Sequence, residues 1–222
     1  MISLENISYR YRGAQQPAVV DVNCVFEQGC MYALVGPSGS GKSTLLSILA
    51  GLDEPTDGFI TFDGTDLKAM NLDMYRREKI AMIFQSFQLF QLMTVMENVC
   101  YPMELCGIKT RDAKPRARKL LERVGIIPEE MKRYPAHLSG GQQQRVAIAR
   151  SLAAGARVIL ADEPTGNLDR VNTQNVIDIL KSLSHDENYC VILVTHDNEA
   201  ASKADVIYKM SDGYVSMDSD RH

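Results

Sequence analysis

A glycine-rich segment between an apolar strand and a helix constrains the fold of this chain more than any other feature. It reads Gly36-Pro37-Ser38-Gly39-Ser40-Gly41-Lys42-Ser43-Thr44, after the apolar run 31–35 and ahead of the helical pattern 43–51. In such a unit the glycines let backbone N–H groups close around phosphate oxygens, the lysine approaches the β and γ phosphates, and the serine approaches Mg²⁺. This phosphate loop (36–44) predicts that a nucleoside triphosphate binds. It contacts phosphates only, so it does not set the identity of the base.

Apolar strands alternate with helical segments along most of the chain. Alternation of this kind favours a mainly parallel sheet with flanking helices. The fold class is therefore α/β: a P-loop NTPase core with an N-terminal antiparallel β region. The expected strands are 2–8, 19–26, 31–35, 59–62, 80–84, 157–161 and 190–195, with a closing hairpin of 206–210 and 214–215 around Asp212-Gly213. The expected helices are 43–51, 71–79, 140–154 and 171–184.

The region from about 86 to 134 has a different pattern. Helical spacing covers 94–104 and 112–124, and no convincing strand interrupts them. We expect a helical subdomain of about 86–150 inserted into the α/β core. The chain, 1–222, then forms one domain, in which 1–85 and 151–222 supply the β region and the phosphate-loop core.

Composition excludes several other classes of protein. The 222 residues carry a net charge of −4, which gives no global nucleic-acid footprint. No apolar run approaches the roughly 20 residues of a membrane span, and the first residues lack the pattern of a signal peptide. The five cysteines have no Cys-x-x-Cys spacing, which favours reduced thiols over a disulfide or metal role. Any membrane connection must therefore come through a partner.

A second glycine turn, Leu138-Ser139-Gly140-Gly141-Gln142, opens the helical pattern of 140–154. A helix N-terminus presents free backbone N–H groups and the positive end of the helix dipole, which together form a ready-made phosphate site. Two such helix ends in one short chain suggest a nucleotide that is held from two sides.

Two adjacent acids, Asp162 and Glu163, follow the buried strand 157–161. In an open parallel sheet, residues just past the strand C-termini line the ligand crevice. Asp162 is then placed for the Mg²⁺ shell as an acidic partner of Ser43, and Glu163 can orient or deprotonate an attacking water. Burying two acids costs several kcal/mol unless a cation shares the site.

With the loop, the second turn and the acids in this order, the sequence resembles the nucleotide-binding subunit of an ABC transporter over essentially its whole length. The turn 138–142 corresponds to that family's signature, and we call it the signature turn. The resemblance implies that Gln85 links metal and water to the transport partner and that His196 contacts the γ-phosphate. It also implies that Asp169 lies in the loop that crosses to the opposing subunit and that Ser139 and Gly141 are the hydrogen-bond donors of the signature. In the same way, Tyr11 is expected to stack on adenine, with Tyr9 as the second choice.

The family mechanism would also explain the second phosphate site. It implies that two copies pair head to tail, so that each ATP, with Mg²⁺, lies between one copy's phosphate loop and the other's signature turn. The remaining signature residues, Gly140 and Gln142, join the nucleotide contacts in that reading. The expected complex is a dimer that drives an integral membrane permease from the cytoplasmic face, without nucleic acid.

The segment Pro164-Thr-Gly-Asn-Leu-Asp169 resembles the branch that serves macrolide and antimicrobial-peptide export, lipoprotein release and the cell-division transporter. Two residues depart from that branch: His137 stands where Gln or Glu is usual, and Gln91 stands where Pro is frequent. Neither departure removes a catalytic group.

Two alternatives come from other classes of protein. A soluble ABC-type ATPase of DNA repair or translation usually carries long coiled-coil insertions or two ATPase halves, which this chain lacks. A phosphate-loop kinase or GTPase would leave the signature turn and His196 unexplained.

The sequence leaves the role of two segments undecided. Met93, Met96 and Met103 fit a partner surface or core packing equally, and the basic run 109–119 favours a solvated face over contact with acidic lipid or a partner loop.

Overall fold

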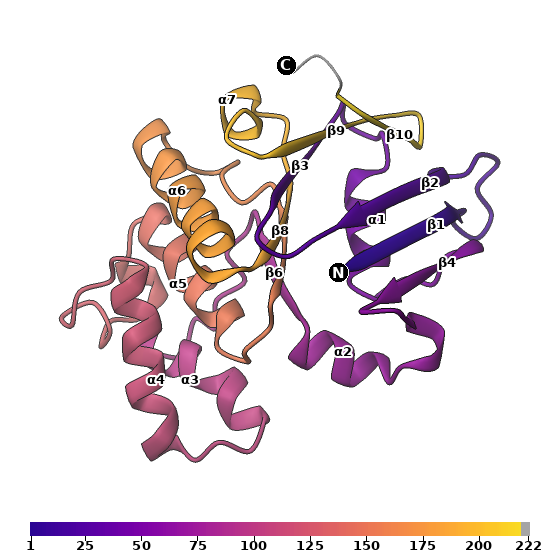
Figure 1. Cartoon of the computed structure of the whole chain (residues 1–222). Coiled ribbons are helices and arrows are strands. Elements are labelled where there is room, and N and C mark those ends of the chain that lie inside the picture. The colour runs from indigo at the N-terminus through magenta and orange to yellow at the C-terminus, as the bar shows by residue number, and fades with distance from the viewer. Residues whose placement is uncertain (219–222) are drawn as a thin grey trace.

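Two β-sheets face each other, and helices cover the far side of the larger one (Figure 1). The computed structural model describes residues 1–218. Residues 2–26 form two strands of the smaller sheet, and residues 31–35 then form one strand of the larger sheet. The chain returns to the smaller sheet over residues 57–66 and forms the other strands of the larger sheet from residue 80 onward.

The smaller sheet is antiparallel, in the order β2-β1-β4-β5. In β1 the buried side chains are Ile2, Leu4 and Ile7, so strict alternation is broken once. The pairing register shifts between Leu4 and Ile7, where Asn6 adopts a positive φ of 52°. A bulge there returns Ile7 to the core face. Its strands are β1 Ile2–Tyr9, β2 Val19–Phe26, β4 Asp57–Phe62 and β5 Thr65–Asp66.

The larger, central sheet has the order β10-β9-β3-β8-β7-β6 and is parallel except for the β9–β10 hairpin. All five residues of β8 are buried, as expected for a strand covered on both faces. The carboxyl ends of β3, β6, β7 and β8 meet at one edge of this sheet, where the loops that follow them converge. Its strands are β3 Met31–Val35, β6 Ile80–Phe84, β7 Val158–Asp162, β8 Cys190–Val194, β9 Val206–Ser211 and β10 Tyr214–Met217.

Helix α1 (Lys42–Leu49) lies between the two sheets. Leu45, Leu46, Ile48 and Leu49 are buried in one cluster with the inner faces of both sheets. A helix that is apolar around most of its surface needs such burial on two sides. This packing fixes the start of α1, and with it the phosphate loop.

A second hydrophobic core lies where the helices pack against the other face of the central sheet. Helix α3 begins with a capping box in which Thr94 and Glu97 satisfy each other's backbone N–H groups. Helix α4 buries only Ala113, Ala117 and Leu121, so a narrow apolar stripe holds an otherwise polar helix. The helices are α2 Leu72–Glu78, α3 Val95–Leu105, α4 Thr110–Arg123, α5 Gly140–Leu152, α6 Arg170–Glu187 and α7 Asn198–Ala201, with short 3₁₀ turns at Leu67–Ala69 and Pro135–His137.

The α/β fold class, with its mainly parallel sheet and antiparallel N-terminal region, is confirmed. Several element ends differ from expectation, because hydrogen bonding rather than hydropathy sets them. The strand expected at 157–161 runs from Val158 to Asp162, and the helix expected at 171–184 extends to Glu187. The sequence showed no sign of the short elements β5 and α7. The division into 1–85, 86–150 and 151–222 stays a prediction.

Candidate active site

The phosphate loop connects β3 to α1 and allows no side chain at two of its glycines. A Cβ on Gly36 would lie 2.1 Å from the backbone oxygen of Met210, and one on Gly41 would lie 2.2 Å from that of Ala18. Gly41 also has a φ of 104°, which disfavours any L side chain. Close approach to neighbouring backbone therefore requires these glycines in this chain.

Lys42 folds back over the loop that precedes it. Its ammonium group donates to the carbonyl oxygens of Gly36 and Pro37, each at 2.8 Å, and the residue is buried. An ammonium group has three donors, so a third remains for a ligand. The cation thus stands at the mouth of the loop, close to its backbone N–H groups.

Ser43 and Asp162 meet at the end of β7. The Ser43 hydroxyl donates to Asp162 Oδ1 at 3.1 Å. Burial raises the pKa of the Asp162 carboxyl above its ordinary value and the charge of Glu163 adds to this, whereas the bond from Ser43 and the charge of Lys42 oppose it. A hydroxyl and a carboxylate are the oxygen ligands that Mg²⁺ accepts, and it usually takes only one or two carboxylates and completes its shell with phosphates and water. Residues 1–218 contain no cluster of three or more His, Cys, Asp and Glu that could hold a metal ion.

Glu163 is held in an unusual conformation. Its φ of 49° lies in the left-handed region, and its N–H donates to Val194 O at 3.0 Å. Its Oε2 lies 2.8 Å from His196 Nδ1, and the side chain of Glu163 is only 20% exposed. Non-glycine residues keep such backbone angles where the surroundings enforce them, frequently at functional sites. The bond to the adjacent strand fixes the backbone of Glu163, while the buried Oε2 lies beside His196 without a hydrogen-bond partner among the described residues.

A cavity of 520 Å³ brings most of the expected nucleotide-binding residues together. At its edge the Tyr11 hydroxyl lies 2.9 Å from Thr44 Oγ1, and the Tyr11 ring packs edge to face on Tyr9 at a centroid distance of 4.9 Å. Tyr11 rather than Tyr9 therefore faces the cavity. The lining comprises Tyr11, Ala18, Gly36, Ser38, Gly39, Gly41, Lys42, Ser43, Thr44, Glu163, Val194 and His196.

Gln85, which follows β6, does not line this cavity. Its Nε2 donates to Asn167 Oδ1 at 3.4 Å, and Asn167 Nδ2 donates to Gln85 O at 3.1 Å. A Cβ on Gly166 would lie 2.7 Å from Gln85 Nε2, so the two segments touch closely. No sequence pattern pointed to Asn167, although Asp169, two residues later, is expected in the loop that crosses to the opposing subunit.

The signature turn forms a second cluster, away from the cavity, since none of residues 138–142 lines it. Ser139 caps α5 and forms a capping box with Gln142. A Cβ on Gly141 would lie 2.0 Å from Asn172 Oδ1, and Asn172 donates twice to Asp169, from its backbone at 2.9 Å and its side chain at 2.7 Å. These bonds hold the pKa of Asp169 below its ordinary value. No sequence signal pointed to Asn172, which joins Asp169 to the turn.

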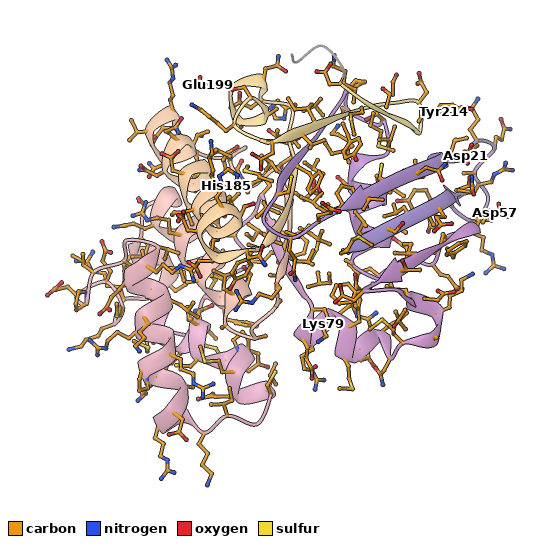
Figure 2. The ribbon with its side chains drawn as sticks, viewed as in Figure 1. Asp21, Asp57, Lys79, His185, Glu199 and Tyr214 are labelled. Atoms are coloured by element: carbon orange, nitrogen blue, oxygen red, sulfur yellow. The ribbon has the colours of Figure 1, made fainter. Side chains whose placement is uncertain are left out.

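Glu163 and His196 also line a second cavity, of 260 Å³, on their other side. Arg170 at the start of α6 pairs there with Glu199 at 3.2 Å. Figure 2 labels Glu199 on α7. The Glu163–His196 pair therefore stands between two cavities, and only the first is bordered by the phosphate loop.

The structure decides in part between the alternatives for the methionine-rich segment and the basic run 109–119. Met103 is buried in the helical core, whereas Met93 and Met96 are half-buried, and Leu92 beside them is almost fully exposed. Several cations of the basic run line a 750 Å³ groove between α4 and the loop 128–132. In the part of the chain that the structure describes, no helix is long and apolar enough to cross a membrane.

Comparison with known proteins shows the family to which this chain belongs. Residues 19–166 match the family model described as "ABC transporter". The uncharacterised ABC transporter ATP-binding protein YclH of Bacillus subtilis is 37% identical over 98% of this chain and 96% of its own length. The macrolide export ATP-binding/permease protein MacB 2 of Aeromonas hydrophila is 43% identical over all of this chain, which spans 35% of that protein.

A solved structure extends the likeness to three dimensions. It is the dimeric post-hydrolysis state of the ATP-binding cassette MJ0796 bound to ADP and phosphate, and it superposes with a TM-score of 0.90 at 35% identity, covering all of both chains. Sequence and fold thus agree along the entire length. This chain belongs to the ABC transporter family, as an ATP-binding subunit with ATPase activity.

Proposed function

We propose that two copies of this chain close head to tail over two ATP molecules and drive a separate membrane permease. The observation that carries the proposal is the separation of the two phosphate-binding turns. One chain's cavity contains the phosphate loop, Glu163 and His196, but none of its own signature turn. A second copy would supply that turn. The dimeric state of the MJ0796 cassette supports the same arrangement.

Within one site, this chain's residues divide the work. Loop N–H groups and Lys42 bind phosphate oxygens, His196 contacts the γ-phosphate, and Tyr11 stacks on adenine after its hydroxyl leaves Thr44. From the second copy, Asp169 and the signature turn approach the same nucleotide. Ser43, Asp162 and Gln85 would hold Mg²⁺, which when bound neutralises phosphate charge.

Glu163 accepts the proton of the attacking water in this proposal. Its carboxylate is half-buried, and the backbone conformation of Glu163, with the bond from its N–H to Val194 O, sets where this side chain leaves the chain. A base whose position is fixed in advance needs less reorganisation during the reaction. Closure acts as a switch because both halves of the site contact the nucleotide only in the closed state.

The permease is proposed as a separate integral membrane protein, with this chain peripheral on the cytoplasmic face. MacB 2 carries both an ATP-binding and a permease part, and this chain spans 35% of it. On the branch resemblance we propose export of, or resistance to, antimicrobial peptides or macrolides, or lipoprotein release. Co-purification with a multi-span membrane protein tests this, whereas recovery with only ribosomes or DNA would favour the soluble alternative.

Replacement of the base tests the mechanism. Glu163→Gln should bind ATP, hydrolyse it at least about a hundredfold more slowly, and accumulate a closed dimer. Gel filtration with Mg-free ATP measures the dimer, and phosphate release measures the rate. A rate close to wild type would refute the assignment of Glu163 as the base.

A further inference from the structure

We propose that Glu130 is a positioning residue for the signature turn, acting through the side chain of Gln142 in its own chain. Glu130 lies in the segment between α4 and α5, outside the phosphate loop, the strand-end acids and the signature turn itself. The inference rests on the proposed head-to-tail dimer, because it concerns how one copy prepares its turn for the other copy's ATP.

Glu130 is a buried acid with defined partners. The residue is 8% exposed, and a carboxylate is rarely buried without compensating bonds. Its Oε2 accepts from the backbone N–H of Ile127 at 3.1 Å, and its Oε1 accepts from Gln142 Nε2. The first bond ties Glu130 to its own loop. The second reaches across to the first turn of α5, which begins at Gly140.

Both polar atoms of the Gln142 carboxamide are therefore hydrogen-bonded. Its Oε1 accepts from the Ser139 backbone N–H at 2.8 Å, while its Nε2 donates to Glu130. An N–H on one side and a carboxylate on the other permit only one orientation of this amide. Gln142 therefore braces the turn from within its own chain.

This bracing prepares Ser139 and the glycines for an incoming phosphate. The Gln142 backbone N–H donates to Ser139 Oγ at 3.3 Å, so the hydroxyl keeps its own proton for another acceptor. The N–H groups of Gly140 and Gly141 lie in the first turn of α5, where a helix offers them no internal partner. Donors that point outward from a fixed turn are suited to an oxyanion.

Loss of the Glu130 bond would free the Gln142 amide to rotate away from Ser139. The capping box would then open, and the turn would lose its fixed geometry. The ATP-binding cavity would keep its structure, because neither Glu130 nor Gln142 lines it. The expected defect is therefore in dimer closure, not in the binding of ATP to a single chain.

An exchange of the two side chains tests this geometry. Glu130→Gln places an amide N–H₂ group opposite one of the two N–H donors, Ile127 N–H or Gln142 Nε2, that now bond to the carboxylate. Gln142→Glu places a second carboxylate opposite that of Glu130. The double variant Glu130→Gln/Gln142→Glu restores every bond: Gln at 130 donates to Glu at 142, which still accepts from the Ser139 N–H. Glu129→Gln is the matched control, since this neighbour is exposed and has no hydrogen bond to the turn.

The closing experiment measures ATP-driven dimerisation of these variants in the Glu163→Gln background by analytical ultracentrifugation. Each single exchange should weaken dimerisation about tenfold, and the double exchange should restore it to within about threefold of the parent. Affinity of the single chain for a fluorescent ATP analogue should stay unchanged in Glu130→Gln, because Glu130 does not line the ATP-binding cavity. Single variants that behave like Glu129→Gln, or a double exchange no better than the singles, would overturn the inference.

A second readout separates this inference from the proposed function. Hydrogen–deuterium exchange at the Ser139 and Gln142 amides of the nucleotide-free chain should accelerate in each single variant and return to the parent rate in the double exchange. This pattern would support the Glu130 brace even where the parent failed to dimerise, a failure that would refute the head-to-tail proposal instead. Unchanged exchange in the single variants would refute the brace.

Discussion

The phosphate loop and the signature turn, the two turns for which we propose phosphate binding, are built in different ways. The phosphate loop depends on backbone approach: Gly36 and Gly41 each lie so near a neighbouring carbonyl that a Cβ would overlap it. The signature turn depends instead on side chains, with Ser139, Gln142 and Glu130 bonded in series. The first turn borders a cavity with side chains from several elements around it, whereas the second presents its donors outside that cavity. In the proposed head-to-tail dimer, a single chain would hold halves of two sites.

The largest expected effect separates the two turns by function. Lys42→Ala should lower the affinity of the single chain for ATP by about a hundredfold, because a charge-assisted contact to phosphate is lost in a partly buried site. Ser139→Arg should leave that affinity within about twofold and abolish ATP-driven dimerisation. Fluorescent-ATP titration and gel filtration measure the two quantities. Equal loss of ATP affinity in both variants would break the comparison.

Within the phosphate loop, two glycines should differ in their effect on stability. Gly36→Ala places a Cβ 2.1 Å from Met210 O, so backbone must move, and we expect a loss of about 3 kcal/mol in the free energy of unfolding. Gly39→Ala meets nothing within 4 Å and carries only the strain of a φ of 80°, about 1 kcal/mol. Urea unfolding compares them. A Gly39 variant as unstable as the Gly36 variant would contradict this account.

The smallest expected effect concerns the cluster behind the signature turn. Asn172→Ala removes the side-chain hydrogen bond to Asp169 Oδ2 and keeps the backbone bond to Oδ1, so the pKa of Asp169 should rise part of the way towards its ordinary value. A carboxyl whose folded-state pKa is lowered adds stability above its unfolded-state pKa, and this stability is lost as the pH falls through the folded-state pKa. The variant should therefore lose less stability on acidification.

Carboxyl ¹³C NMR between about pH 2 and about pH 6 measures the pKa of Asp169 directly. Asn175→Ala, an exposed residue one turn further along α6, is the control and should leave it unchanged. An Asp169 pKa that does not respond to Asn172→Ala would show that Asn172 does not connect Asp169 to the turn.

The sheet and the phosphate loop could be predicted from the sequence because each has a local residue pattern. Continuous apolar runs identify the buried strands β7 and β8, and the glycine spacing identifies the loop. Contacts between segments that are distant in the sequence have no such local pattern. Asn167 and Asn172 are ordinary polar residues in the sequence, and only the fold brings them to Gln85 and Gly141.

The strained backbone of Glu163 also lay beyond prediction from sequence. Two adjacent acids after a strand indicated a site, but the φ of 49° and the bond of the Glu163 N–H to Val194 O appear only in the folded chain. The capping box at Ser139 could be read from Ser and Gln at the right spacing, whereas its extension to Glu130 depends on how the loop after α4 returns to α5.

The central claim is that the phosphate loop of one copy faces the signature turn of another. Ser38 and Ser139 are exposed members of these two turns, so each can be replaced by cysteine in a single chain that also carries Cys106→Ser and Glu163→Gln, with single-cysteine controls. A short bis-maleimide should then link two chains only when ATP is present, giving a band of twice the mass on a denaturing gel. A link within one chain, or a two-chain link that forms equally without ATP, would contradict the account.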